Sequence, residues 1–347
     1  MNLNQARKFL NLGSSPLVDT KGRTITAMTK EGRLFYKPSG HSLCLGPAGS
    51  RKTSTIHSCG IISAILNPSI SCVCIDPKDG ENAAMWAPVA RAYGRPTYII
   101  DPKRVLRRYR IDEDVTDINP SGSLVETFLN NPEDLVDALE DTSLPYIPEP
   151  GNDDKNKIFR ERPRSYIDYA HLSLLERNPK YCTPGGAATF LNEPNFSNML
   201  EIDVEEGSPM LQNMAATILS TKKDVPEHHS QFLSSAQQAL RGYQSGTKLH
   251  DFGLNAEKSY GELLNEKAII FVVGEQRYMA SNAPLFGSIL NGFMQAQLSG
   301  APETHYLIDE ATNIPSLSKM IERMTVSRGY GGHLFFTGQS ISEFERV

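Results

Sequence analysis

The chain has 347 residues, of which 39% are hydrophobic and 22% are charged, and its formal net charge is −5. These values are those of an ordinary globular protein and exclude an intrinsically disordered chain. The acidic balance argues against a basic surface built for tight, independent nucleic-acid binding, although it leaves room for a local basic patch or a ring with a positive lumen. The length allows two domains, or one large domain with an insertion.

Residues 1–40 read as a polar lead-in with short β segments at 24–28 and 33–36. We find no chemistry in this part of the chain. Its first residues lack the apolar core of a signal peptide, and no apolar run in the sequence is long enough to cross a bilayer.

The segment HSLCLGPAGSRKTST, residues 41–55, combines a short apolar strand, a glycine-rich turn, a Lys-Thr pair and the start of a helix. This order is typical of a phosphate-binding loop, in which backbone N–H groups and the helix N-terminus face the anion. We expect Lys52 to reach the terminal phosphates of a nucleotide and the Thr53 hydroxyl to hold Mg²⁺. The residues expected to bind the nucleotide are Gly46, Pro47, Ala48, Gly49, Ser50, Arg51, Lys52, Thr53 and Ser54.

One position departs from the pattern G-x-x-x-x-G-K-[ST], because Arg51 stands where the pattern has glycine directly before the lysine. The Arg51 side chain must turn away from the phosphates, or the backbone must adjust. The alternative interpretation of the segment is a glycine-rich strand–turn–helix without a bound nucleotide.

Strands and helices alternate from the loop to residue 120. An apolar strand at 70–75 ends in the charged turn 76–82, a helix follows at 83–93, and a second strand spans 97–100. This alternation predicts a parallel sheet covered on both faces, with ligands at the carboxyl ends of its strands. Asp101 and Pro102 predict the N-cap and first turn of a further helix. Residues 101–110 contain five basic residues and one acid, which indicates a solvated charged face or a contact with a polyanion or partner.

From residue 124 to about 249 the β-branched runs disappear, and apolar residues recur at helical spacing in segments 132–139, 158–175, 210–219 and 231–243. Residues 145–156 predict a polar loop, and residues 181–195 look similarly rich in turns. We interpret the block as an all-α insertion that interrupts the α/β domain. The predicted domains are 1–40, 41–123, 124–258 and 259–347, and the second and fourth form one nucleotide-binding domain.

The sheet resumes with a strong strand at 268–273, a helix at 283–298 and the strand Tyr-Leu-Ile before Asp309 and Glu310. Two carboxylates at a strand end are the second part of a phosphate-loop ATPase. We expect Asp309 to orient the Mg²⁺ ligands and Glu310 to act as general base toward the attacking water.

Two further residues are candidates at the C-terminal end of the chain. Gln339 follows the next strand, 333–336, and could contact the terminal phosphate or the attacking water; a strand-end amide that caps a turn is the alternative. Arg328 lies in a glycine-rich turn and could reach a neighbouring subunit's nucleotide as an arginine finger; a surface arginine is the alternative.

Five cysteines are present, and Cys72 and Cys74 alternate with apolar neighbours in a predicted strand. We interpret them as buried small hydrophobic residues rather than a metal or redox pair.

Together these segments resemble the VirD4/TraG family of type IV secretion coupling proteins. The matching stretches are HSLCLGPAGSRKTS (41–54), CIDPKDGEN (74–82), IIDP (99–102), DINP (117–120), YLIDEATNIP (306–315) and SRGYGGHLFFTGQS (327–340). The resemblance implies a RecA-like P-loop domain, a ring of six subunits with ATP and Mg²⁺ between neighbours, and an all-α domain that receives substrates. It assigns phosphate-loop roles to Lys52 and Thr53, Walker B roles to Asp309 and Glu310, and arginine and phosphate-sensing roles to Arg328 and Gln339.

The sequence also departs from what the family implies. Arg51 brings efficient hydrolysis into question, and no membrane anchor precedes the loop although family members often carry one. The family continues with further sheet and helix after the region of Val347. We therefore expect either a soluble variant or the cytoplasmic piece of a longer protein at the bacterial inner membrane.

Two functions are compatible with these observations. The first is an ATPase that pumps DNA or protein substrates toward a secretion channel, together with other type IV secretion components. The alternative is a weakly hydrolysing or non-hydrolysing coupling adaptor whose all-α domain binds effector proteins. A small-molecule kinase fits less well, because the Asp-Glu pair and Gln339 suit hydrolysis.

Overall fold

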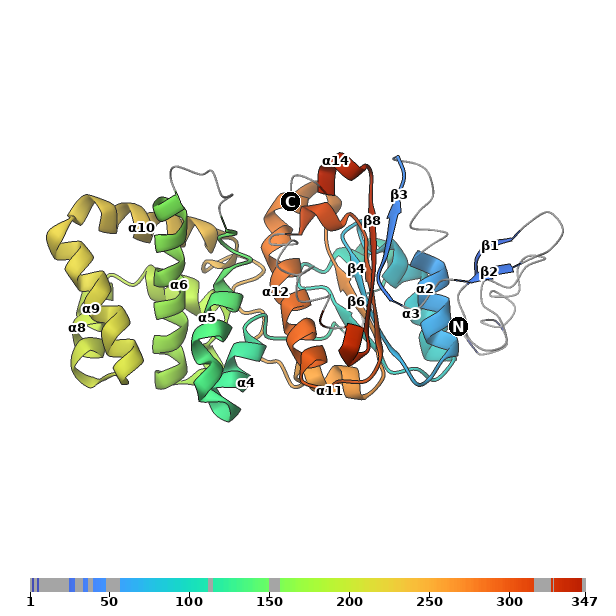
Figure 1. Ribbon diagram of the computed structural model, residues 1–347, viewed down its shortest axis with the longest axis horizontal. Helices are drawn as coiled ribbons and strands as arrows, with labels where there is room; N and C mark the ends of the chain where they lie inside the picture. Colours follow the sequence, from blue (N-terminus) through green and yellow to red (C-terminus); the bar gives the residue numbers. More distant parts are fainter. Residues whose placement is uncertain are drawn as a thin grey trace. The chain divides into compact units, whose positions relative to one another are not determined.

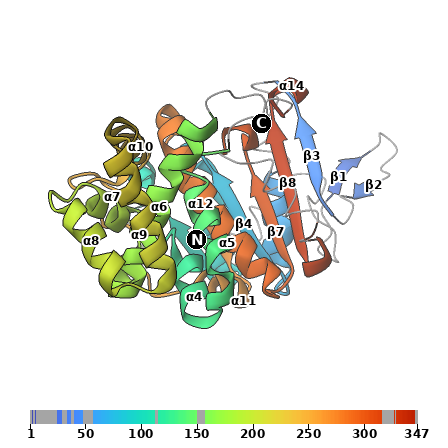
Figure 2. The same ribbon diagram turned by 60° about the vertical axis from the view of Figure 1, so that its left-hand side comes forward.

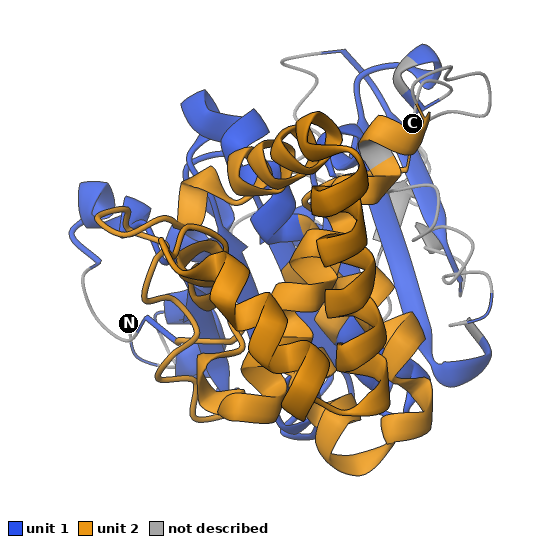
Figure 3. Ribbon diagram, turned by 90° about the vertical axis from the view of Figure 1, so that its left-hand side faces the viewer, with its two compact units in different colours: residues 1–116, 260–286, 293–347 blue, residues 117–259, 287–292 orange. Residues whose placement is uncertain are grey.

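The computed structural model describes residues 2, 5, 25–28, 34–36, 40–47, 57–111, 115–149, 157–314, 326 and 328–344. The chain falls into two compact units, shown in different colours in Figure 3. The first unit comprises residues 1–116, 260–286 and 293–347, and the second comprises residues 117–259 and 287–292.

Within the described part of the first unit, six strands form one parallel sheet in the order β3-β8-β7-β4-β6-β5. Figure 1 labels β3, β8, β4 and β6 of this sheet. The strands are β3 (Ser42–Leu45), β4 (Ser71–Asp76), β5 (Thr97–Ile100), β6 (Ile269–Val273), β7 (Thr304–Ile308) and β8 (Gly332–Gly338). Each lies within two residues of the predicted bounds, and the predicted α/β class with a parallel sheet is confirmed. A separate antiparallel pair, β1 (Ile25–Met28) and β2 (Leu34–Tyr36), matches the short β segments predicted in the lead-in.

Helices cover both faces of this sheet. The helices of the unit are α2 (Ser58–Leu66), α3 (Glu81–Ala92), α11 (Tyr260–Asn265), parts of α12 (Met279–Leu298) and α14 (Ile341–Phe344), with 3-10 turns η2 (Val105–Tyr109), η6 (Gln276–Tyr278), η7 (Ala311–Asn313) and η8 (Arg328–Tyr330). On one face, α2 and α3 share a core with alternate residues of the strands. On the other, the Tyr306 hydroxyl donates to the Phe293 carbonyl oxygen of α12 at 3.2 Å. Every residue of β4 and β6 is buried, as expected for central parallel strands.

Close approach of α2 to the sheet depends on Gly60. A Cβ added at this glycine would lie 2.8 Å from the Leu307 Cδ2 atom of β7. The helix that follows the predicted phosphate loop is therefore held directly against the strand that ends in the two carboxylates.

The helix predicted to begin at Asp101 is absent, and this prediction was wrong. Arg104 adopts a left-handed conformation (φ 56°), and the 3-10 turn η2 begins only at the next residue. The Asp101 carboxylate accepts hydrogen bonds from the backbone N–H groups of Val105 and Leu106, both at 2.9 Å. Its capping role is thus retained for a shorter turn, and Arg104 does not share a helical face with the arginines that follow.

The described residues of the second unit contain helices without strands, consistent with the predicted all-α block (Figure 2). Its helices are α4 (Gly122–Asn130), α5 (Leu135–Ser143), α6 (Lys157–Arg177), α7 (Pro184–Leu191), α8 (Phe196–Glu206), α9 (Pro209–Asp224) and α10 (Pro226–Ala239), with 3-10 turns η3 (Pro132–Asp134), η4 (Pro179–Tyr181) and η5 (Arg241–Tyr243). A buried carboxylate joins α6 to α8, because Asp203 accepts from Tyr169 at 2.6 Å and pairs with Arg177 at 2.6 Å.

The segment 181–195, predicted to be rich in turns, contains α7. Thr183 caps this helix by accepting from the Gly186 N–H at 3.0 Å, and Pro184 occupies its first turn. The capping threonine and the proline are helix-start signals that the turn-rich composition concealed.

Cys72 and Cys74 are fully buried, as expected for small hydrophobic residues in a central strand. In the part of the chain that the structure describes, no helix combines the length and apolar character needed to span a bilayer.

Candidate active site at the strand ends

Three neighbouring strands of the sheet lead to the residues singled out in the sequence. β8 lies between β3 and β7, with Leu45 paired to Gly338 and Ile308 paired to Phe336. Because the strands are parallel, their carboxyl ends share one edge of the sheet. The start of the predicted phosphate loop, Gln339 and the Asp-Glu pair are therefore gathered at this edge.

The predicted phosphate loop is described only at its first residues. The Gly46 N–H donates to the Gly338 carbonyl oxygen at 3.2 Å, which fixes the start of the loop beside the end of β8. Pro47 follows. The other predicted loop residues lie outside the described residues: Ala48, Gly49, Ser50, Arg51, Lys52, Thr53 and Ser54.

Asp309 is buried, with 1% of its surface exposed, and its carboxylate is held on both oxygens. Oδ1 accepts from the Thr337 hydroxyl of β8 at 2.5 Å and from the Glu310 N–H at 3.0 Å. Oδ2 lies 3.0 Å from Nζ of Lys78. The side chain thus presents a fixed carboxylate oxygen to a cation.

Glu310 has the left-handed backbone conformation (φ 49°, ψ 47°), which is uncommon for residues other than glycine. Successive side chains of a strand point to opposite faces, and this turn interrupts the alternation. As a result the carboxylates of Asp309 and Glu310 both reach Lys78, the second with 2.9 Å between Oε1 and Nζ. The other Glu310 oxygen, Oε2, lies 3.5 Å from Nε2 of Gln339, which places the predicted base and the predicted sensor side by side.

Lys78 was missed as a site residue, although it lies in the charged turn quoted from the sequence. Burial lowers the pKa of this lysine, but Asp309 and Glu310 raise it more, so the net pKa lies above its usual value. The ammonium is therefore held in its charged form between two carboxylates. The sequence shows a lysine in a charged turn at a strand end, but the fold alone shows that this strand lies beside the Asp-Glu strand.

The turn that carries Lys78 is fixed by Asp76 and by a glycine. Asp76 accepts from the N–H groups of Asn82 and Ala83 at 2.8 and 3.2 Å, at the N-terminus of α3. Burial raises the pKa of Asp76 to about 7, while these backbone hydrogen bonds oppose the rise. Gly80 has φ 76°, and a Cβ there would lie 2.4 Å from a Leu106 methyl carbon, so the turn requires glycine.

The arginine predicted as a finger, Arg328, begins the 3-10 turn η8 before β8. Its contact with a nucleotide stays a prediction.

The donor set fits a hard divalent cation. Asp309 offers a buried carboxylate oxygen that already faces a positive charge, and Mg²⁺ is commonly held by one or two carboxylates together with substrate phosphates. Among the described residues, no group of three or more His, Cys, Asp and Glu side chains is placed to enclose a metal. A cation shared between protein and phosphate suits this site better than a closed structural metal centre does.

A family model described as the TraM recognition site of TraD and TraG matches residues 303–347. The match includes β7, Asp309, Glu310, β8 and Gln339. It covers the second half of the candidate site, and the remainder of the chain lies outside it.

Solved structures of the conjugative coupling protein TrwB match the whole chain. The unbound TrwB fragment lacking 70 N-terminal residues is 14% identical with a TM-score of 0.66, covering 100% of this chain and 71% of that chain. TrwB in complex with ADP and Mg²⁺ is 15% identical with a TM-score of 0.65, covering 100% of this chain and 73% of that chain. The TM-scores show that the fold is shared, although the sequences are only 14–15% identical.

None of the curated proteins matches the sequence. The family-model match and the shared fold confirm the resemblance to the VirD4/TraG coupling proteins that the sequence predicted.

Proposed function

We propose that this chain, which resembles the VirD4/TraG coupling proteins in fold and in its C-terminal part, is an ATP-binding and ATP-hydrolysing subunit of a type IV secretion or conjugation system. The observation that carries the proposal is the Asp309–Glu310 pair at the end of β7. Gln339 follows the neighbouring strand β8, and the predicted phosphate loop follows β3 on the other side of β8. The same edge of the sheet thus offers a metal ligand, a base and a sensor.

In the proposed reaction Glu310 accepts the proton of the attacking water, and the Gln339 amide beside it orients that water. Asp309, held by Thr337, and Thr53 would hold Mg²⁺, while Lys52 and the loop N–H groups would bind the phosphates. When bound, the metal ion would neutralise negative charge on the phosphates.

The proposal includes assembly and partners. Subunits form a ring of six, in which Arg328 contacts the neighbouring subunit's nucleotide. The ring moves DNA or effector proteins in the cytoplasm or at the cytoplasmic face of the inner membrane, together with other secretion components. The match to a TraM recognition site supports a protein partner at residues 303–347.

Steady-state ATP turnover with Mg²⁺, with and without DNA, tests the enzymatic part of the proposal. Glu310→Gln should lower turnover at least ~100-fold while retaining nucleotide binding, because it removes the base alone. Lys52→Ala should lose both turnover and binding of a fluorescent ATP analogue. Glu303→Gln, which changes a half-exposed carboxylate just before β7, is the matched control and should keep turnover. Full activity in both Glu310→Gln and Lys52→Ala would refute the proposal.

Arg51 favours a second candidate, a coupling adaptor that hydrolyses ATP weakly or not at all and recruits effectors through its helical unit. Arg51→Gly should then raise turnover, since it restores the glycine of the loop pattern. Ordinary turnover in the native chain would remove the main support for this candidate.

A further inference from the structure

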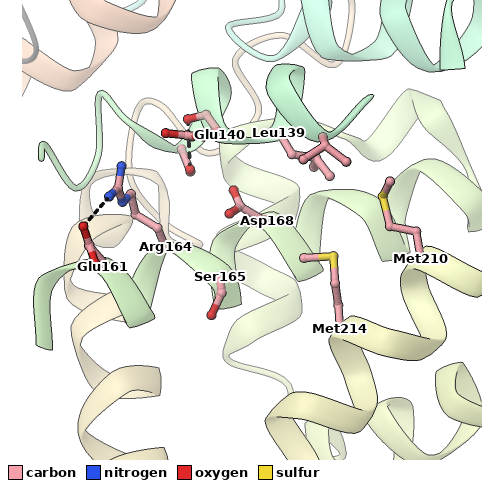
Figure 4. A pocket seen from close by; sticks show the side chains of 10 residues that line it. Leu139, Glu140, Glu161, Arg164, Ser165, Asp168, Met210 and Met214 are labelled. Atoms are coloured by element: carbon pink, nitrogen blue, oxygen red, sulfur yellow. Dashed lines mark hydrogen bonds and ion pairs between the residues drawn. The ribbon is translucent and has the colours of Figure 1, made fainter. Parts of the chain in front are cut away.

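A cavity of about 460 Å³ lies between helices α5, α6 and α9 of the second unit, and its polar side chains pair with one another (Figure 4). The Arg164 guanidinium pairs with Glu161, and Asp168 is hydrogen-bonded to Ser143. In the first unit, by contrast, a buried polar side chain lies beside the candidate active site and has no role in the proposed mechanism. This side chain is the completely buried imidazole of His57.

His57 lies directly before α2, four positions after Thr53, which is expected to hold Mg²⁺. Its imidazole packs edge-to-face against Phe335 of β8, with 5.8 Å between the ring centroids and 76° between the ring planes. Phe335 and Thr337 point to the same face of the sheet, because side chains alternate along a strand. His57 therefore reaches both residues from the face that α2 covers.

Two hydrogen bonds in series join His57 to the predicted metal ligand. Nε2 of His57 lies 3.3 Å from the Thr337 hydroxyl oxygen, and this hydroxyl donates to Oδ1 of Asp309 at 2.5 Å. The Asp309 carboxylate faces the Lys78 ammonium through its other oxygen, so it accepts here rather than donates. A threonine hydroxyl has one hydrogen, which Thr337 already donates to Asp309, so Thr337 can only accept from the imidazole. Nε2 of His57 must therefore carry a hydrogen.

We propose that His57 is a positioning residue for Asp309. Its Nε2–H fixes the Thr337 hydroxyl so that the hydroxyl hydrogen points at the carboxylate, and His57 acts through Thr337 rather than by contact with the nucleotide. Because His57 belongs to the segment that follows the predicted phosphate loop, the two bonds hold the loop side of the site and the metal-ligand carboxylate in register. The inference rests on the proposed function, since it takes Asp309 as the Mg²⁺ ligand.

The expected consequence concerns the metal more than the phosphates. Groups that hydrogen-bond to metal ligands orient them, and their loss lowers metal affinity or activity about 10–100-fold. Loss of the His57 donor should therefore weaken the contribution of Mg²⁺ to nucleotide binding and leave the phosphate contacts of the loop in place. A histidine that only filled the core would instead lower stability without a specific effect on the metal.

NMR of the full chain with ¹⁵N-labelled histidine tests the first step, the hydrogen on Nε2. At about pH 8, where imidazole is ordinarily neutral, we expect the signal of a protonated nitrogen from Nε2 and that of a bare nitrogen from Nδ1. The His57 signals are assigned by their loss in His57→Gln. Thr337→Val should shift the Nε2 signal by removing its acceptor, whereas Thr304→Val should not. A bare Nε2 in the native chain would overturn the proposal, because such a nitrogen cannot donate to Thr337.

Calorimetric titration with ADP, in EDTA and in Mg²⁺, tests the positioning role. The ratio of the two affinities measures the contribution of the metal. His57→Leu should lower this ratio at least ~10-fold and leave the affinity in EDTA unchanged. His57→Gln places an amide N–H near the position of Nε2 and should keep the ratio, whereas His57→Asn is one carbon shorter and should lose it.

His171→Leu is the matched control, because His171 is a completely buried histidine of the second unit whose Nε2 lies 3.2 Å from the Ser121 hydroxyl oxygen. It should lower stability and keep the native affinity ratio. The proposal is overturned if His57→Leu and His57→Asn keep the native ratio, or if His171→Leu lowers the ratio equally. A native chain that binds no ADP would refute the proposed function; a protonated Nε2 would then still support the hydrogen-bond series, and a bare one would overturn it.

Discussion

Nζ of Lys78 lies 2.9 Å from Oε1 of Glu310, so the carboxylate expected to act as general base is paired with an ammonium from the neighbouring strand end. The same ammonium lies 3.0 Å from Oδ2 of Asp309. The Lys78 ammonium therefore contacts the carboxylate oxygen of Asp309 that is expected to face Mg²⁺. In the proposed mechanism, Lys78 must release these carboxylates as the metal–nucleotide complex binds.

Replacement of Lys78 by methionine should make the stability of the protein depend on Mg²⁺. Without the ammonium, two buried carboxylates repel each other, and we expect a loss of roughly 2–3 kcal/mol in EDTA. Millimolar Mg²⁺ should restore more stability in Lys78→Met than in the native chain, because the ion takes over the vacated charge. Thermal unfolding in EDTA and in Mg²⁺ measures both effects.

Arg108→Met provides the matched control for this prediction. Arg108 pairs with Asp79 of the same turn at 2.7 Å, but 41% of its side chain is exposed. Loss of the Arg108 guanidinium should lower the free energy of unfolding by less than about 1 kcal/mol, and Mg²⁺ should not raise the stability of this variant more than that of the native chain. An equal Mg²⁺ response in both variants would contradict the assignment of Lys78 as the counter-ion of the site.

Thr337→Val should destabilise the protein while preserving side-chain shape. The substitution removes the donor that reaches Asp309 at 2.5 Å, and hydrogen bonds to charged groups contribute about 1.5–3 kcal/mol. Thr304→Val removes a bond to the neutral Pro302 carbonyl oxygen and should cost less, about 0.5–1.5 kcal/mol. Urea unfolding of the two variants checks the order, and a reversed order would show that Thr337 does not anchor Asp309.

Asp168→Asn should become more stabilising as pH rises. Burial raises the pKa of Asp168 to about 7, against the opposing influence of Ser143 and Arg164, with Glu140 contributing to the rise. The folded state then keeps a proton that the unfolded state releases above about pH 4, so native stability falls at this site between pH 4 and 7, by up to ~4 kcal/mol. Asparagine does not titrate, so the stability of Asp168→Asn lacks this loss between pH 4 and 7.

Unfolding free energies at pH 4 and pH 8 test this sign. The difference between Asp168→Asn and the native chain should be small at pH 4 and clearly positive at pH 8. Asp137→Asn, on the exposed surface of α5, is the control and should show no such trend. A difference for Asp168→Asn that is constant across this range would mean that the carboxyl group does not titrate as proposed.

Arg95→Lys should loosen α2, the helix that follows the predicted phosphate loop. The buried Arg95 guanidinium donates to carbonyl oxygens near the end of α2 and to those of Ile70 and Lys267. A lysine has one ammonium and cannot reproduce this planar fork, so several buried carbonyls lose a partner. We expect a loss of at least about 3 kcal/mol, since each unsatisfied group costs about 1–3 kcal/mol. Arg91→Lys on the exposed side of α3 should be nearly neutral, and an equally small effect at Arg95 would contradict this account.

The sequence alone determined where the strands of the sheet lie and which of them end in candidate site residues. Short apolar runs such as 268–273 and 97–100, bounded by turn residues, predict buried strands, and two further runs end in the Asp-Glu pair and in Gln339. It also predicted that a helical block follows the first part of the sheet, because the loss of β-branched runs is a local property of the chain; the predicted start at residue 124 stays a prediction. The role of the phosphate-binding residues from Ala48 to Ser54 stays a prediction.

Only the tertiary structure decided which strand ends meet. Local pattern does not specify that β3 pairs with β8, nor that β4 brings Lys78 onto both carboxylates, since these contacts join residues more than 200 positions apart. The same holds for Arg104, whose left-handed backbone conformation replaces the start of the helix that the Asp-Pro signal predicted. Side-chain pairing across a sheet is set by packing of the whole domain, and for that reason the lysine at the centre of the candidate site could be quoted from the sequence but not assigned.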